Sequence, residues 1–189
     1  MRRLPVIVLV VAAGVFVGVL IVAQTAMSNH LSPPAFSVNG HEVTQRDLNA
    51  DLDSIANSGQ IDQTSKRTQG SVTSDFGAAW VTRLIQTRLV LEELGRHDLR
   101  VTDADRRRLE RQAGSQLKGL SSSVKRTILD YNLGLQKLQQ KLGQSAATKA
   151  VAQAARGAKV SVDPRYGQWN EHRLLVCAPS GCPSSTQGG

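Results

Sequence analysis

Hydrophobic residues recur through most of the chain at the spacing of helices that have one apolar side. Leu48, Leu52 and Ile55 are separated by four and three residues, which predicts an amphipathic helix around them. A second helix is predicted over residues 74–94, where apolar residues surround most of the circumference. A helix that is apolar on nearly all sides is expected to be central. Gly95 is its expected C-terminal cap.

The most regular pattern in the chain falls between residues 124 and 142. Six apolar residues follow one another at intervals of 4, 3, 4, 3 and 4, which is the spacing of a helix that packs along a partner helix. The expected partner is the preceding helix, residues 103–118, folded back as a helical hairpin. That helix offers a stripe of only Leu109, Ala113 and Leu117. The six residues of the seam are Val124, Ile128, Tyr131, Leu135, Leu138 and Leu142.

Two interpretations of this seam remain open. Either neighbouring helices bury it completely, or part of it is accessible to another polypeptide. The second interpretation predicts a polypeptide-binding surface, since an exposed apolar patch tends to mark an interaction site. The candidate binding residues are Ile128, Tyr131, Leu135 and Leu138, and the basic residues that rim them are Lys125, Arg126, Lys137 and Lys141.

Short β-type stretches lie toward both ends of the helical region. Asn39-Gly40 between two such stretches predicts a hairpin, because both turn residues need positive φ. Residues 160–162 alternate like a strand. An Ala-rich helix is expected over residues 145–156. The fold class is therefore mostly α with a small β element.

Two threonines have the pattern of helix N-caps. Thr44 and Thr102 are each followed three residues later by an acid, Asp47 and Asp105. Such an arrangement lets the Thr hydroxyl accept from the backbone amide of the third helical residue. Helices are therefore expected to begin directly after both threonines.

The N-terminal segment, residues 1–28, sets the expected compartment. Arg2-Arg3 precede about 20 uncharged residues, enough to cross a bilayer. Basic residues stay in the cytoplasm, so everything after the segment is expected on the extracytoplasmic side. The segment is either an uncleaved anchor in the plasma membrane or a cleaved signal peptide that leaves a secreted domain. Residues 29–35, with Pro33-Pro34, are the expected linker.

The composition and the motifs limit which ligands and reactions we expect of this protein. The net charge is +8, but outside a cell a basic domain does not indicate nucleic acid, and we expect no nucleic-acid partner. No phosphate loop, HExxH or GxSxG motif occurs. The four histidines are scattered, so we expect no catalytic residues, no metal and no cofactor. The tail, residues 171–189, is expected to be flexible because Ser, Gly and Pro dominate it. Within it, Cys177 and Cys182 are expected to form a disulfide, with two free thiols as the alternative.

The order of these pieces resembles the N-terminal chaperone domain of SurA/PrsA-type extracytoplasmic foldases. The resemblance covers about residues 35–169. It is carried by residues 36–44 (FSVNGHEVT) with Asp47-Leu48, residues 81–89 (VTRLIQTRL), 101–105 (VTDAD), 136–138 (QKL) and 160–169 (VSVDPRYGQW). It implies a helical domain over residues 36–170 that holds unfolded or secreted polypeptides, and whose first and last strands pair.

The chain departs from the complete foldases at one place. Those enzymes carry a parvulin prolyl-isomerase domain before the closing strand, whereas only 17 residues separate Leu142 from Val160. The resemblance therefore implies a chaperone-like holdase without isomerase activity. One alternative is a membrane-anchored structural or assembly protein that binds one fixed partner through the helix of residues 124–142, which carries the heptad seam. The other is a degenerate isomerase. The sequence leaves the client and the oligomeric state open.

Overall fold

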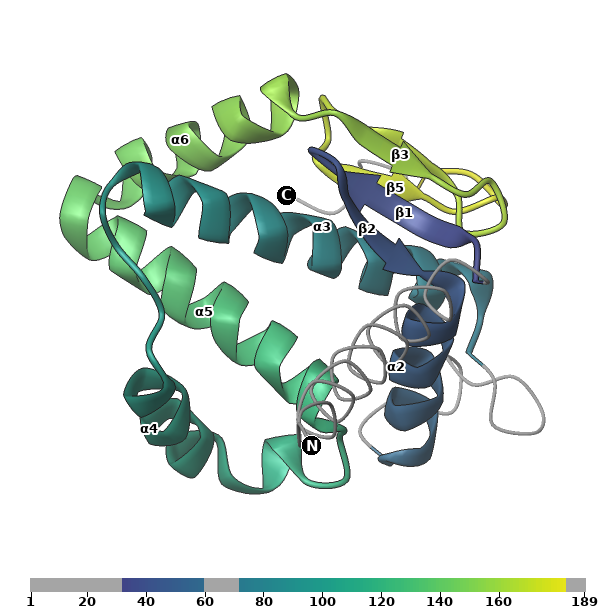
Figure 1. The fold of residues 1–189 in the computed structure, drawn as a ribbon, viewed down its shortest axis with the longest axis horizontal. Coiled ribbons are helices and arrows are strands. Elements are labelled where there is room, and N and C mark those ends of the chain that lie inside the picture. Colours follow the sequence, from purple (N-terminus) through teal and green to yellow (C-terminus); the bar gives the residue numbers. More distant parts are fainter. Residues whose placement is uncertain (1–31, 60–71, 183–189) are drawn as a thin grey trace, which may run out of the picture. The chain divides into compact units, whose positions relative to one another are not determined.

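The computed structural model describes residues 32–59 and 72–182, and the chain divides into two units, Met1–Pro33 and Pro34–Gly189. The second unit contains all the described elements (Figure 1), and helices dominate it, as predicted. In chain order its elements are β1 (Pro34–Val38), β2 (His41–Thr44), α2 (Gln45–Asn57), α3 (Ser74–Arg96), α4 (Asp103–Ala113), the short 3-10 helix η2 (Gly114–Leu117), α5 (Ser122–Leu142), α6 (Gln144–Gly157), β3 (Val160–Val162), β4 (Gln168–Asn170) and β5 (Leu175–Cys177).

The two ends of the helical region meet in an antiparallel sheet with the strand order β2-β1-β3. Phe36 lies opposite Val162, and Val38 lies opposite Val160. This confirms the predicted pairing of the first and last strands. The Asn39-Gly40 hairpin is also confirmed, since β1 pairs with β2 across it and both turn residues have positive φ. Residues 34 and 35, expected to end a linker, belong to β1.

Both predicted N-caps are present. The Thr44 hydroxyl accepts from the amide of Asp47 at 3.2 Å, so α2 begins directly after it. Thr102 and Asp105 form a complete capping box, in which each side chain also bonds the other residue's backbone amide. The predicted helix over 103–118 is interrupted after Ala113, where η2 follows.

The predicted end of α3 at Gly95 is wrong. The helix continues to Arg96, and it is Asp98 that has positive φ, at 56°. The amide of Leu99 then bonds the carbonyl of Leu94 at 2.9 Å. Asp tolerates the left-handed conformation better than most residues, so the turn does not need the glycine.

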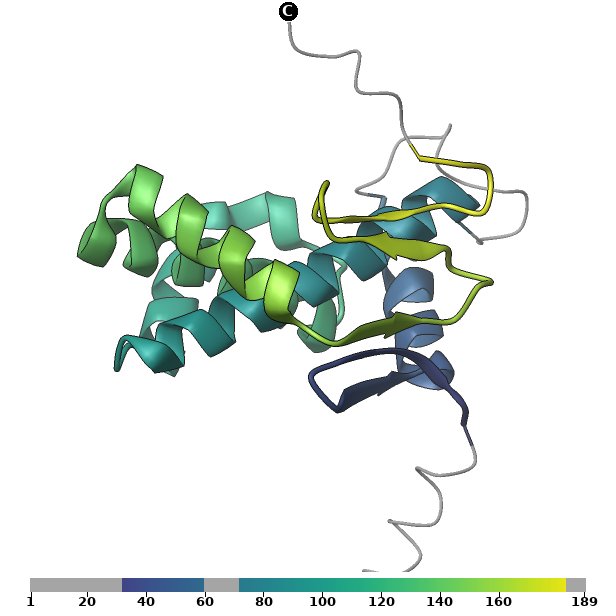
Figure 2. The ribbon, with the colours of Figure 1, turned by 90° about the horizontal axis from the view of Figure 1, so that it is seen from above.

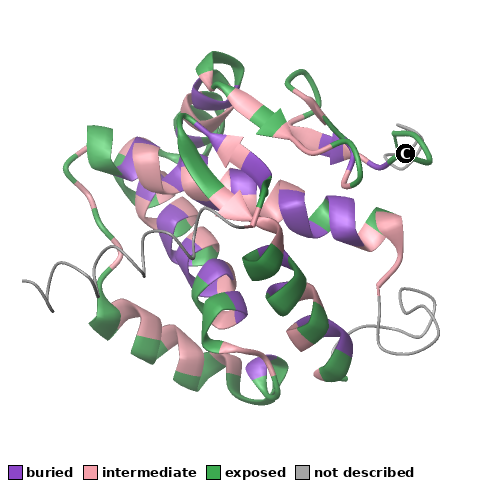
Figure 3. Ribbon diagram, turned by 45° about the vertical axis from the view of Figure 1, so that its right-hand side comes forward, coloured by how far each residue is buried: buried purple, intermediate pink, exposed green. Residues whose placement is uncertain are grey.

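Helix α3 is the centre of the unit, as its all-round apolar pattern predicted. It packs against the sheet, β5, α5 and α6, and ten of its 23 residues are buried. Figure 3 shows buried stretches, in purple, along both α3 and α5. The largest fully buried side chains are Leu48, Ile85, Leu89, Leu94, Leu138, Val38, Val81, Val90 and Val124.

The prediction that the tail from residue 171 is flexible is wrong for residues 171–182, which the structure describes as ordered. Residues 168–177 form a second antiparallel hairpin, β4–β5, in which Trp169 lies opposite Val176. Val176 and Ala178 are buried against the main hydrophobic cluster. The folded unit therefore extends beyond the predicted boundary at 170. The rest of the predicted tail lies outside the described residues.

No helix in the described ranges is both long enough and apolar enough to cross a bilayer. The predicted anchor or signal segment, residues 1–28, lies outside those ranges.

Candidate functional site

Helix α5, which carries the predicted binding residues, packs against α3, α4 and α6. It packs tightly against α3 at Gly134, where a Cβ atom would lie 2.5 Å from Val90 Cγ1. Toward α4 it presents Leu129 and Leu133, which pack with Leu109 of that helix. The expected hairpin of α4 and α5 is therefore present, but the seam does not lie along α4. Of the six seam residues, Ile128 packs at the margin of this cluster, and Leu129 and Leu133, which fall beside the seam, form its buried part.

The four predicted binding residues do not share one environment. Leu138 is 0% exposed and packs with Val90, Leu94 and Ala147, so it belongs to the core between α3, α5 and α6. Ile128, Tyr131 and Leu135 are half-buried.

The three half-buried residues differ in how much support they have. Ile128 packs at the margin of two hydrophobic clusters. Tyr131 packs at the margin of the third cluster, which contains Leu138. Leu135 belongs to none of the three clusters that the described residues form. Leu135 is therefore the seam residue with the least packing support, and the best placed to contact another chain.

Tyr131 is linked to α3 by a cation–π contact. The guanidinium carbon of Arg83 lies 4.0 Å from the centroid of the Tyr131 ring. Such contacts stabilise by about 0.5–1 kcal/mol at exposed sites. The same Arg83 also lines a groove on α3, so it connects the accessible side of α5 with that groove.

The groove lies between the N-terminal half of α3 and the segment around β5, and its volume is about 610 Å³. Figure 2 shows the β4–β5 hairpin beside this part of α3. Small and apolar side chains line the groove together with polar and charged ones. The lining residues are Asp75, Ala78, Ala79, Thr82, Arg83, Gln86, Arg173, Leu174, Leu175, Val176, Ala178, Ser180, Gly181 and Cys182. We call it the β5 groove.

Three polar contacts from α3 hold the outer wall of the β5 groove. The hydroxyl of Thr82 accepts from the backbone amide of Val176 at 2.7 Å. Gln86 donates to the carbonyl of Leu174 at 2.9 Å, and Ser180 donates to Asp75 at 2.6 Å.

The end of this wall is closed covalently by the disulfide between Cys177 and Cys182. Together with the contacts from α3, the disulfide fixes residues 174–182 as one side of the groove.

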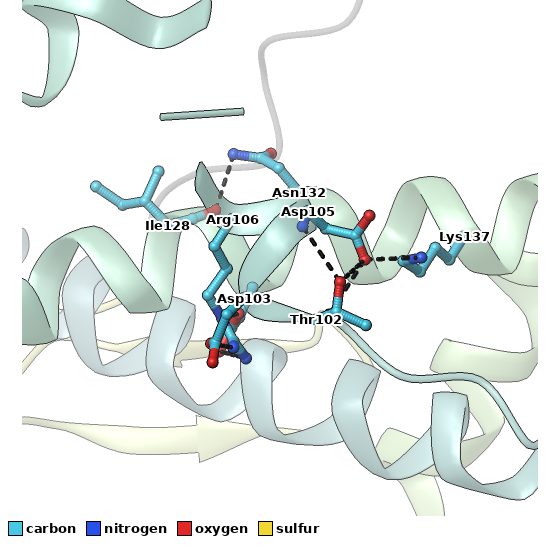
Figure 4. A network of polar contacts seen from close by, with 8 residues as sticks. Thr102, Asp103, Asp105, Arg106, Ile128, Asn132 and Lys137 are labelled. Carbon is cyan, nitrogen blue, oxygen red and sulfur yellow. Dashed lines mark hydrogen bonds and ion pairs between the residues drawn. The ribbon is translucent and has the colours of Figure 1, made fainter. Parts of the chain in front are cut away.

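A second polar network joins α4 to α5 (Figure 4). Asp105 accepts from the Thr102 hydroxyl at 2.8 Å and pairs with Lys137 of α5 at 3.0 Å. Arg106 bridges Asp103 of its own helix and Asp130 of α5, each at 2.6 Å. The network fixes α4 along α5 although no residue of α4 is buried.

Hydrogen bonds in this network shift two pKa values. The bonds from Thr102, with a smaller contribution from Lys137, lower the pKa of Asp105 from 3.8 to about 2. The bonds to Asp130 raise the pKa of Arg106 above its usual value. Both groups are therefore charged at neutral pH, and neither is positioned as a general acid or base.

The β5 groove was missed by the sequence reasoning. One wall comes from residues whose Ser, Gly and Pro content predicted flexibility, and the other from a helix whose apolar pattern indicated only burial. The run Leu174-Leu175-Val176-Cys177 was the available signal, because four apolar residues beside a paired cysteine favour an ordered strand.

The geometry defines a helical domain that is closed by strands from both ends and carries a groove beside its central helix. A family model described as the SurA-like N-terminal domain matches residues 2–112, more than half of the chain. The chain belongs to this family. The matched range includes β1 to α3 and most of α4, and it ends before α5.

No curated protein and no solved structure matches the chain. The family match is therefore the finding that relates this chain to known proteins.

Proposed function

We propose that this protein is an extracytoplasmic holdase-type chaperone, which binds unfolded or secreted polypeptides and lacks prolyl-isomerase activity. Membership of the SurA-like family supports a chaperone-like role. The proposed compartment comes from the basic start and uncharged run of residues 1–28, whether as an anchor in the plasma membrane or as a cleaved signal.

The observation that carries the proposal is that Arg83 links the β5 groove to the accessible side of α5. Arg83 lines the groove and also contacts Tyr131. Ala79 is an exposed, small residue on the α3 side of the groove, and Leu175 is half-buried on the other side. A groove that combines small apolar side chains with a comparable share of polar groups suits extended segments of varied sequence.

The absence of isomerase activity is part of the proposal. The chain between α5 and β3 forms the single helix α6, at the point where the foldases that it resembles carry their parvulin domain. Uncatalysed prolyl exchange takes tens to hundreds of seconds. We expect the protein to leave that rate unchanged in a proline-containing test peptide. A rate that rises in proportion to protein concentration would overturn this part of the proposal.

The holdase role can be tested with residues 34–189, since the hydrophobic clusters that hold the unit together lie within residues 35–178. Aggregation of several unrelated denatured proteins is followed by light scattering, with and without the domain. We expect suppression for all of them. Binding of a single folded partner at fixed stoichiometry, with no suppression, would instead support the assembly-protein alternative.

The position of the site is tested by filling the groove. Ala79→Trp places a large side chain in the β5 groove at an exposed position, so folding should be unaffected. Ala146→Trp is the matched control, an exposed alanine of α6 that does not line the groove. We expect only Ala79→Trp to lose suppression while both variants keep the wild-type circular dichroism. Equal activity of the two variants would exclude the β5 groove as the site.

A further inference from the structure

The hairpin of α4 and α5 carries a large share of the positive charge of the chain. Residues 103–142 contain nine Lys and Arg residues against four Asp and Glu residues, a net charge of +5 in a chain whose total is +8. Each of the four acids is already paired with a cation of the same hairpin. The pairs are Asp103 with Arg106, Asp105 with Lys137 and Arg108, Glu110 with Lys125, and Asp130 with Arg106.

The acids of the hairpin therefore leave two arginines of α4 uncompensated. Arg107 and Arg111 are exposed, and within the described ranges neither forms an ion pair. They lie four residues apart, so they are neighbours on one side of the helix, where like charges disfavour the helix. Arg108, exposed beside them, keeps only a 3.6 Å contact with Asp105. We call these three residues the arginine face.

The chemistry of this face indicates a phosphate-bearing ligand. All three residues are arginine, whose planar guanidinium binds phosphate oxygens in pairs and is weakly hydrated. The exposed side of α4 has no large apolar residue, so it would lie on an anionic surface without inserting into it. Where residues 1–28 stay in the membrane as an anchor, the short segment of residues 29–33 would keep the domain close to a bilayer.

We propose that the arginine face docks the domain on the anionic phospholipid headgroups of the membrane. None of the three arginines lines the β5 groove. Docking would therefore leave the groove free, and the proposal does not depend on holdase activity. Each Lys or Arg near an anionic membrane surface contributes a modest attraction that salt screens.

The test is co-sedimentation of residues 34–189 with vesicles of phosphatidylglycerol and phosphatidylcholine, compared with phosphatidylcholine alone. The test variant is Arg107→Gln/Arg111→Gln. Its matched control is Lys149→Gln/Arg156→Gln, which removes the same charge from two exposed positions of α6. We expect binding only to the anionic vesicles, loss of binding at high salt, and at least tenfold weaker binding for the α4 variant. The α6 control should bind like the wild type.

Three outcomes would overturn the proposal. Equal binding to both kinds of vesicle would exclude recognition of anionic headgroups. Equal weakening by the two variants would show that net charge alone is sensed. Release by inorganic phosphate at constant ionic strength would identify free phosphate as the ligand instead of a lipid surface. Circular dichroism of both variants establishes that they are folded.

Discussion

Gly134 of α5 lies directly against Val90 of α3, where the two longest helices of the described residues pack together. A Cβ atom at position 134 would lie 2.5 Å from Val90 Cγ1 and 3.2 Å from Leu94 Cδ1. Both side chains are buried, at 0% and 1% exposed. Val90 is β-branched and has little rotamer freedom in a helix, so it cannot turn aside. The absence of a side chain at residue 134 therefore allows α3 and α5 to pack this closely.

Gly134→Ala is expected to destabilise the domain. Overpacking a well-filled core usually costs about 1–3 kcal/mol, which outweighs the gain of up to about 1 kcal/mol in helix propensity. Chemical denaturation followed by circular dichroism measures the change in the free energy of unfolding. A variant at least as stable as the wild type would contradict this account of the crossing.

Gly95→Ala is expected to stabilise the domain, in contrast to Gly134→Ala. Gly95 is also helical, but it is exposed, and a Cβ atom there would have no neighbour within 4 Å. Only the propensity gain of about 0.5–1 kcal/mol should then appear. We expect this variant to unfold at higher denaturant concentration than the wild type. A loss of stability would mean that the end of α3 needs the glycine after all.

The capping box of α4 predicts a pH dependence of stability. Thr102 and Lys137 lower the pKa of Asp105 from 3.8 to about 2 in the folded state. A carboxyl whose folded pKa is lowered stabilises the fold above its unfolded pKa, and this contribution disappears as the pH falls from about 4 toward 2. Asp105→Asn should therefore be less stable than the wild type at pH 7 and similar to it near pH 2.

Asp53→Asn is the control for this prediction. Asp53 is exposed on α2 and forms no ion pair within the described part of the chain. Its replacement should change the free energy of unfolding little at either pH. If the free energy of unfolding of Asp105→Asn instead changes with pH in the same way as that of the wild type across the acid range, the ionised Asp105 of the capping box does not contribute to stability.

The disulfide predicts that native protein has no free thiol. Alkylation without reduction should leave the mass unchanged, whereas alkylation after reduction should add two groups, on Cys177 and Cys182. Because the loop encloses only four residues, its closure removes less chain entropy than a long loop would. Reduction should therefore lower the melting temperature only slightly. Two alkylated thiols in unreduced protein would contradict the pairing.

Local rules were enough for much of this fold. The N-caps Thr44 and Thr102 and the Asn39-Gly40 turn follow from residue types alone, whereas the pairing of β1 with β3 was expected from the family resemblance. The central position of α3 follows from its all-round apolar pattern.

Such local rules could not predict which face of α5 packs against which neighbouring helix. The face of α5 that meets α3 includes Gly134, which carries no hydrophobic signal, beside the seam residue Leu138, so the heptad pattern identified only part of this face. The β5 groove was hidden for a related reason. Its order depends on contacts between residues 88 or more positions apart, such as Gln86 with Leu174. Long-range contacts of this kind leave little trace in local composition.

The two environments along the α5 seam lead to the sharpest test of the binding surface. Leu138 is completely buried between three helices, so Leu138→Asp would place a charge in the core. That substitution should cost several kcal/mol and unfold the domain. Leu135 is half-buried and outside the hydrophobic clusters of the described residues. Leu135→Asp should therefore keep the wild-type circular dichroism and a melting temperature within a few degrees.

The same pair separates packing from polypeptide binding. If Leu135 contacts clients, the folded Leu135→Asp variant should suppress aggregation less than the wild type, because a charge disfavours contact with apolar segments. Asn132→Asp is the matched control, since it adds one negative charge at an exposed position of the same helix. Unfolding of Leu135→Asp would assign Leu135 to the core. Full suppression by a folded Leu135→Asp variant would remove Leu135 from the binding surface and leave the β5 groove as the remaining candidate.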